Sequence, residues 1–106
     1  MAQPRFETVG TSTIQIAPYN KDRTSISILN NHASNILYIG DDGGLTTTEG
    51  FPIRSYNGIT LAFYSGDDPR RAIYAVASGA STNVRILEGF GGWNPALGAD
   101  NIGSLK

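Results

Sequence analysis

Apolar and polar residues alternate in short segments along this chain, and the alternation predicts β-strands. Residues 13–17 and 24–29 alternate with a period of two, which is typical of a strand with one buried face. Apolar and β-branched residues indicate further strands at residues 36–39, 59–64, 72–77 and 84–88. Two weaker strands are expected at residues 45–48 and 51–53, and Pro52 suits a sheet edge or a bulge.

Turn-forming residues separate the predicted strands. Residues 40–44 read Gly-Asp-Asp-Gly-Gly and predict a loop, because Gly adopts the backbone conformations that tight reversals need. Asn57 and Gly58 form the strongest short hairpin signal in the chain, and they lead into the strand at residues 59–64. Apolar residues do not recur at helical spacing over a helical length, so no helix is expected.

The spacing of these strands predicts the fold class. Strands that recur about every ten residues with polar turns between them are typical of a sandwich or a small barrel, because a single sheet would leave one face bare. We therefore expect an all-β, two-sheet antiparallel β-sandwich of the jelly-roll type with six to eight short strands. The sequence leaves both orientations open at residues 36–39. The expected core consists of Ile14, Ile16, Ile26, Ile28, Leu37, Ile39, Leu61, Phe63, Ile73, Ala75, Val84 and Ile86.

The two ends of the chain differ from this pattern. Residues 1–10 show no alternation and are expected to form an N-terminal arm, which leaves residues 11–88 as the β-sandwich domain. Residues 89–106 contain five Gly and one Pro, which predicts an extended C-terminal arm. Both arms carry apolar side chains that we expect to bind a partner, and wrapping of the C-terminal arm around its own domain is the alternative. The expected anchors are Phe6, Val9, Phe90, Trp93, Leu97, Ile102 and Leu105.

Composition excludes several classes of function. The 106 residues allow a single domain, and 8 Lys and Arg against 9 Asp and Glu leave no basic surplus for binding nucleic acid. No apolar run approaches the roughly 18 residues of a membrane span. The chain has no Cys and one His, which excludes disulfides and thiolate metal sites and leaves little material for acid–base catalysis. We therefore expect a protein that is not an enzyme and needs no cofactor.

Acidic pairs are the main candidates for metal or hydrolytic chemistry. Asp41 and Asp42 lie in a Gly-rich loop, and Asp67 and Asp68 precede a proline. Such carboxylates can contribute to a Ca²⁺ site or to a glycosidase pair, but Asp before Gly or Pro is ordinary turn chemistry. His32 lies among Asn and Ser residues and is best interpreted as a solvated loop histidine. We therefore expect no metal site and no catalytic site.

Aromatic residues support a competing function. The tyrosines together with Trp93 could form a stacking platform for sugars, as in carbohydrate-binding modules. Tyr38, Tyr64 and Tyr74 lie within predicted strands, where packing explains them equally well, and Trp93 lies in the C-terminal arm. Sugar binding is therefore kept as an alternative.

The order of strands and turns between residues 24 and 88 resembles small β-sandwich virion proteins of tailed bacteriophages. The resemblance rests on residues 27–31, 34–40, 50–53, 58–61, 72–79 and 83–88. It implies a non-enzymatic decoration, cement or minor capsid protein that is made in the host cytoplasm and binds the capsid surface of the virion. Its partners would be the major capsid protein or other virion proteins, and it would form a homo-oligomer, with a trimer favoured. A tail, neck or fibre-attachment component is the alternative within this class.

Overall fold

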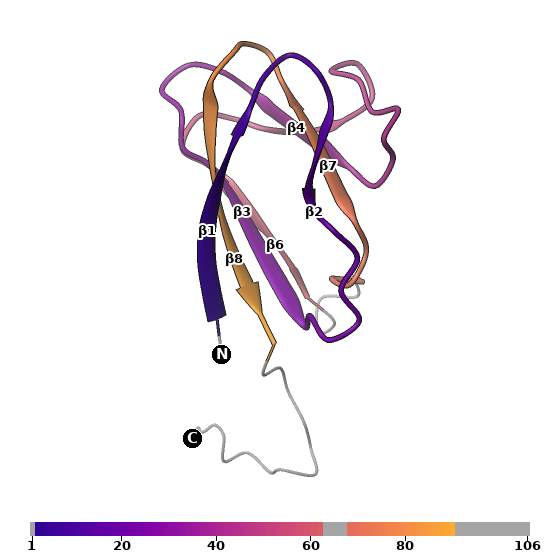
Figure 1. The fold of residues 1–106 in the computed structure, drawn as a ribbon. Helices are drawn as coiled ribbons and strands as arrows, with labels where there is room; N and C mark the ends of the chain where they lie inside the picture. The colour runs from indigo at the N-terminus through magenta and orange to yellow at the C-terminus, as the bar shows by residue number, and fades with distance from the viewer. Residues whose placement is uncertain (1, 63–67, 91–106) are drawn as a thin grey trace, which may run out of the picture.

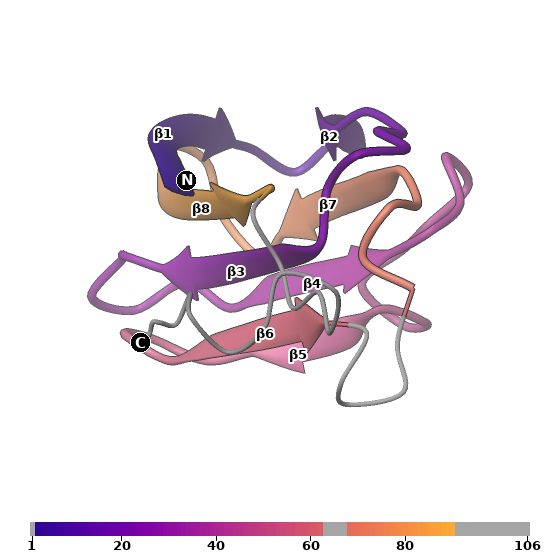
Figure 2. The ribbon, with the colours of Figure 1, turned by 90° about the horizontal axis from the view of Figure 1, so that it is seen from below.

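The computed structural model describes residues 2–62 and 68–90, and within these ranges it shows eight strands and no helix. The strands are β1 (Ala2–Val9), β2 (Ile14–Ala17), β3 (Ser25–Asn30), β4 (Leu37–Gly40), β5 (Phe51–Ile53), β6 (Gly58–Ala62), β7 (Ile73–Ala77) and β8 (Thr82–Gly89). They form two antiparallel sheets, sheet A with the order β1-β8-β3-β6 and sheet B with the order β2-β7-β4-β5. The sheets pack face to face (Figures 1 and 2), which confirms the predicted two-sheet β-sandwich.

The pairing of the strands shows how the chain winds into this sandwich. β1 pairs with β8, β2 with β7, β3 with β6 and β4 with β5, so the first half of the chain runs antiparallel to the second half. The arrangement is that of one long hairpin wrapped over two sheets, as in a jelly roll. As a consequence, strands that are far apart in the sequence lie side by side.

Apolar residues at alternate positions fill the space between the sheets. Ile26 and Ile28 of β3 face inward together, and in β4 the inward positions are Leu37 and Ile39, which decides the orientation that the sequence left open. The core predictions for these four residues are confirmed, as are those for Ile16, Ile73, Ala75, Val84 and Ile86. Leu61 is partly buried against the core, and Phe63 lies outside the described residues.

Ile14 was predicted to be buried, and the structure shows that it is 36% exposed. Ile14 lies opposite the core residue Ala75 and so faces the same inner side, but it begins β2, an edge strand of sheet B, where solvent reaches it. Further along β2, a β-bulge shifts the register with β7 between Gln15 and Ala17 and breaks the alternation, so Ile16 and Ala17 are both buried.

The predicted N-terminal arm at residues 1–10 is wrong, and so is the domain boundary at residue 11. β1 pairs with β8 along its whole length, from Ala2 opposite Gly89 to Val9 opposite Thr82. The sequence of β1 does not alternate between apolar and polar residues, because two of its inward positions near the sandwich edge hold Arg5 and Glu7. These two side chains pair with each other at 2.9 Å. The domain therefore includes the N-terminal segment.

Two further local predictions are also wrong. Residues 45–48 do not form a strand, since residues 45 and 46 are irregular and residues 47 and 48 lie in a turn, and the side chain of Leu45 is buried. Asn57 and Gly58 do not close a hairpin, because β5 belongs to sheet B and β6 to sheet A. The connection passes between the sheets through a turn in which Tyr56 adopts a left-handed conformation with φ of 59°. The predicted edge position of Pro52 is confirmed, since β5 ends sheet B.

Candidate functional site

The outer face of sheet A exposes large apolar side chains. Phe6 of β1, Leu29 of β3 and Leu87 of β8 are 63%, 37% and 44% exposed. Strand register brings them together, because Arg85 lies opposite both Phe6 and Leu29, and Leu87 is the next outward residue of the same strand. We call Phe6, Leu29, Leu87 and the neighbouring Pro4 the outer apolar patch.

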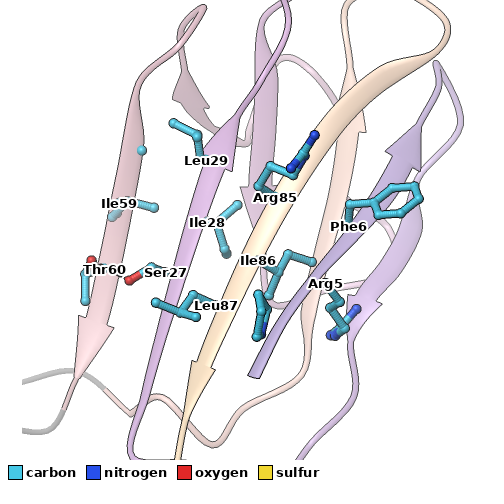
Figure 3. A pocket seen from close by; sticks show the side chains of 12 residues that line it. Arg5, Phe6, Ser27, Ile28, Leu29, Ile59, Thr60, Arg85, Ile86 and Leu87 are labelled. Atoms are coloured by element: carbon cyan, nitrogen blue, oxygen red, sulfur yellow. Dashed lines mark hydrogen bonds between the residues drawn. The ribbon is translucent and has the colours of Figure 1, made fainter. Parts of the chain in front are cut away.

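The outer apolar patch borders a shallow concavity of 520 Å³ that extends over all four strands of sheet A. Figure 3 shows side chains of Phe6, Arg85, Leu87 and Leu29 on this part of the sheet, with Thr60 on the far strand. Exposed apolar groups that cluster around a hollow are typical of interaction sites, whereas scattered ones are not informative. The patch is therefore the strongest candidate site within the described residues.

Two polar contacts lie on the outer face. The Nε atom of Arg85 donates to the Oδ1 atom of Asn83 at 2.8 Å, which holds the guanidinium along β8. Ser27 and Thr60 share a hydrogen bond of 2.8 Å between their hydroxyls. Among the described strand residues, the outer face thus combines apolar contact area with one cation, Arg85, and this suits a protein surface that presents apolar groups and a carboxylate.

The predicted anchor residues fall into four groups. Phe6 lies in the outer apolar patch, where its ring is available to a partner. The prediction of Val9 as an anchor is wrong, because its side chain is 0% exposed and belongs to the core of its own sandwich. Phe90 is half-buried directly after β8. The remaining four predictions, Trp93, Leu97, Ile102 and Leu105, lie outside the described residues.

Leu29, Leu87 and Arg85 were not predicted as site residues. A signal for the two leucines was present, because each follows an isoleucine that faces inward, Ile28 and Ile86. In a strand with one buried face, the second of two consecutive apolar residues points to the outer side. The sequence alone did not show that these two positions would be neighbours across β3 and β8.

The acidic loops form turn contacts in the structure. Asp41 pairs with Arg71 at 2.9 Å, and Asp42 accepts a hydrogen bond from the backbone of Gly44 at 3.0 Å. Asp68 pairs with Arg70 at 2.9 Å, whereas Asp67 lies outside the described residues. Hydrogen bonds from the Arg70 side chain and backbone lower the pKa of the Asp68 carboxyl. No group of three potential metal ligands gathers in the part of the chain that the structure describes.

His32 stabilises the turn in which it lies. Its Nδ1 atom accepts hydrogen bonds from the backbone amides of Ser34 and Asn35 at 3.0 and 2.9 Å. Because this nitrogen is already occupied as an acceptor, the contacts explain the residue as part of the β3–β4 connection.

The exposed tyrosines come from separate parts of the fold. Tyr38 and Tyr74 are half-buried at outward positions of sheet B, and the hydroxyl of Tyr74 is 3.3 Å from the Gln15 amide. Tyr19 precedes β3 and Tyr56 lies between β5 and β6, each 62% exposed. Tyr64 lies outside the described residues.

Comparisons with known proteins place limits on what the fold implies. Residues 2–62 and 68–90 contain no helix that is long and apolar enough to cross a membrane. No family model matches the chain, and no curated protein matches it. The chain is similar to a solved structure described as "Bacillus endospore appendages form a novel family of disulfide-linked pili", with a TM-score of 0.49 and 8% identity over 83% of this chain and 84% of that chain. A likeness this distant carries no argument about function.

Proposed function

We propose that this protein is a structural virion protein of the capsid decoration or cement type, which attaches to an assembled protein shell through the outer apolar patch. The observation that carries the proposal is the exposure of Phe6, Leu29 and Leu87 on one face of sheet A. Apolar surface of this kind gains free energy when a partner removes it from water. The virion setting comes from the resemblance of residues 24–88 to small phage β-sandwich proteins.

The size of the patch fits a protein that binds a repetitive lattice. Complete burial of one Leu or Phe side chain contributes about 1.5–3 kcal/mol, so a few such side chains give modest affinity at one contact. Repeated contacts on a symmetric shell multiply modest affinities when several copies or several contacts act together. Arg85 supplies a charge that can fix the orientation of the contact.

The proposal also assigns a role to the C-terminal arm. Phe90 directly follows β8, the strand of sheet A that carries Leu87. Trp93, Leu97, Ile102 and Leu105 follow it in the sequence and would serve as additional anchors in a neighbouring virion protein. The patch and the arm would then bind the shell together.

A co-sedimentation assay with shells that lack this protein tests the proposal. We expect the substitution Leu87→Asp to weaken binding about 10–100-fold, since it removes one apolar anchor and adds a charge that must be desolvated. Phe51→Asp is the matched control, because Phe51 is 58% exposed but lies on β5 of sheet B. Equal binding by the wild type and the Leu87→Asp variant would refute attachment through this face.

A further inference from the structure

The free edge of β1 is the second surface that the fold leaves open. β1 is one of the two edge strands of sheet A and pairs only with β8 within residues 2–62 and 68–90. On the same side of the sandwich the edge strand of sheet B is β2, where the Nη2 atom of Arg5 donates to the carbonyl oxygen of Ile16 at 2.8 Å and occupies one backbone acceptor. Figure 2 shows β1 and β2 along the same side of the sandwich. An eight-residue strand with an open edge is a template for pairing with another strand.

The hydrogen-bond pattern shows which backbone groups of β1 face outward. The amide of Asn31 donates to the carbonyl oxygen of Asn83 at 2.9 Å, so the odd-numbered residues of β8 face β3. Because backbone groups alternate in direction along an antiparallel strand, the even-numbered residues of β8 face β1. The register then turns the backbone of Arg5, opposite Ile86, toward β8.

The same alternation turns the backbone groups of Pro4, Phe6 and Thr8 to the free edge. Pro4 lacks an N–H group, and its position on the outward side of an edge strand is where proline is tolerated. Phe6 and Thr8 each present an N–H donor and a carbonyl acceptor there. The edge can therefore pair over a short segment centred near Phe6.

The sequence of this segment is complementary to itself. We propose that two copies of this chain form a dimer by antiparallel pairing of their β1 strands about a twofold axis beside Phe6. Arg5 of each copy then lies opposite Glu7 of the other copy, and the two Phe6 rings lie opposite each other on the outer face. The two Phe6 residues exchange backbone hydrogen bonds, and each Thr8 amide donates to the carbonyl oxygen of Pro4 in the second copy.

Charge favours the register centred on Phe6 over the registers shifted by one residue in either direction. A shift that centres the axis on Arg5 places two guanidinium groups opposite each other, and a shift that centres it on Glu7 places two carboxylates opposite each other. Like charges directly across a strand pair are unfavourable, whereas opposite charges are favourable. The side chains of Arg5 and Glu7 are 31% and 37% exposed and pair with each other at 2.9 Å, so the dimer would place two such pairs next to each other as a network of alternating charges.

The dimer would enlarge the outer apolar patch. Pairing along β1 joins the two copies of sheet A into one continuous sheet, and Phe6 at the junction makes the two patches contiguous. A twofold contact of this kind uses the same surface on both copies and closes after two. The trimer implied by the phage resemblance requires a different contact. The inference concerns association of the chain with itself and holds whether or not the partner of the patch is a capsid.

Cysteine cross-linking of the full chain tests the register, because the chain contains no Cys. We expect the Phe6→Cys variant to form a disulfide-linked dimer under mild oxidation, since residues opposite each other in a hydrogen-bonded pair have Cα atoms about 5.5 Å apart. Phe51→Cys, at an equally exposed aromatic position of sheet B, is the control and should remain monomeric. Thr8→Cys should also fail to cross-link, because its two copies would lie about 14 Å apart along the strands.

Sedimentation velocity over a range of concentrations tests the association without cysteines. The wild type should form dimers, and Glu7→Arg should weaken dimerisation at least tenfold because it places cations opposite each other, while Glu49→Arg should not. Circular dichroism checks that each variant is folded.

Two results would overturn the dimer: a wild type that stays monomeric at millimolar concentration, or cross-linking of Phe6→Cys no faster than that of Phe51→Cys. Cross-linking of Thr8→Cys as fast as that of Phe6→Cys overturns the register. Shell binding by a monomeric wild type would reject this inference and leave the proposed function intact.

Discussion

The Nη1 atom of Arg23 lies 2.7 Å from the Oε2 atom of Glu88, and both residues are buried. Arg23 lies between β2 and β3, whereas Glu88 belongs to β8 of sheet A. The guanidinium also donates to the carbonyl oxygens of Pro18, Pro69 and Arg71, which belong to connections next to strands of sheet B. One buried cation therefore fastens the two sheets together at this end of the sandwich.

Loss of the Glu88 charge should destabilise the protein strongly. The substitution Glu88→Gln leaves Arg23 buried without its counter-charge, and removal of one partner of a buried ion pair costs about 3–5 kcal/mol. Glu88 also accepts a hydrogen bond from the Nε atom of Arg5 at 3.1 Å, so β1 should loosen as well. Urea unfolding measures the change in the free energy of unfolding.

The control for this experiment is Arg85→Gln, which removes a charge from an exposed position of the same strand. We expect it to change stability by less than about 0.5 kcal/mol. A loss below about 1 kcal/mol for Glu88→Gln would show that the buried pair does not hold the sheets together.

The strands with one clearly apolar side were predictable from the sequence. In β3, β7 and β8 aliphatic residues occupy consecutive inward positions, and this places Ile26, Ile73 and Ile86 in the core. β1 was not predictable in this way, because its inward positions hold Arg5 and Glu7. These charges are tolerated only because the edge location and the contacts with Glu88 and Ile16 satisfy them, and those contacts depend on the tertiary structure.

The candidate site was predictable only in part. Phe6 was predicted as a partner-binding anchor of the N-terminal segment, but Leu29 and Leu87 of the patch lie more than 20 residues away from it in the sequence. Leu29 and Leu87 become neighbours of Phe6 only through the pairing of β1, β8 and β3. Single-sequence periodicity describes one strand at a time and therefore does not show which strands are adjacent.

Asn30 should be essential for the connections around the end of β3. It is 0% exposed, and its Nδ2 atom donates to the carbonyl oxygens of Asn35 at 2.8 Å and Ile53 at 2.9 Å. The substitution Asn30→Leu removes both donors and leaves two carbonyl groups without these partners. We expect a loss of about 1–3 kcal/mol for each buried group left unsatisfied, measured by urea unfolding.

A second substitution at this position separates hydrogen bonding from volume. Asn30→Asp keeps the size of the side chain but turns a carboxylate oxygen toward acceptors, so it should destabilise the protein at neutral pH. Wild-type stability of the Asn30→Asp variant at neutral pH would contradict the role of the two donors.

The contact between Asp68 and Arg70 should be visible in a titration. Hydrogen bonds from Arg70 lower the pKa of the Asp68 carboxyl below 3.8 in the folded protein. A carboxyl whose pKa is lower in the folded state stabilises the fold above its unfolded pKa, and this contribution is lost as the pH falls through the folded value. The contribution to stability should be small, because the pair is exposed.

Carbon-detected NMR titration of the Asp68 carboxyl measures this pKa directly. The substitution Arg70→Ala should raise it toward 3.8, because the largest cause of the shift is removed. Lys21→Ala is the control, because Lys21 pairs with Asp22 and not with Asp68. A wild-type Asp68 that titrates at or above 3.8 would contradict the contact.

Two glycines should respond in opposite ways to an added methyl group. A Cβ atom at Gly50 would lie 2.6 Å from the Cβ atom of Tyr38 and 3.3 Å from the carbonyl oxygen of Thr46, and neither of these atoms can move without the backbone. Gly50→Ala should therefore destabilise the protein by about 1–3 kcal/mol through overpacking beside β4. A Cβ atom at Gly10, by contrast, would meet no atom within 4 Å, so Gly10→Ala should be neutral or stabilise the protein by up to about 1 kcal/mol. Thermal unfolding of the two variants side by side measures the difference, and equal melting temperatures would show that the chain near Gly50 is not packed against β4.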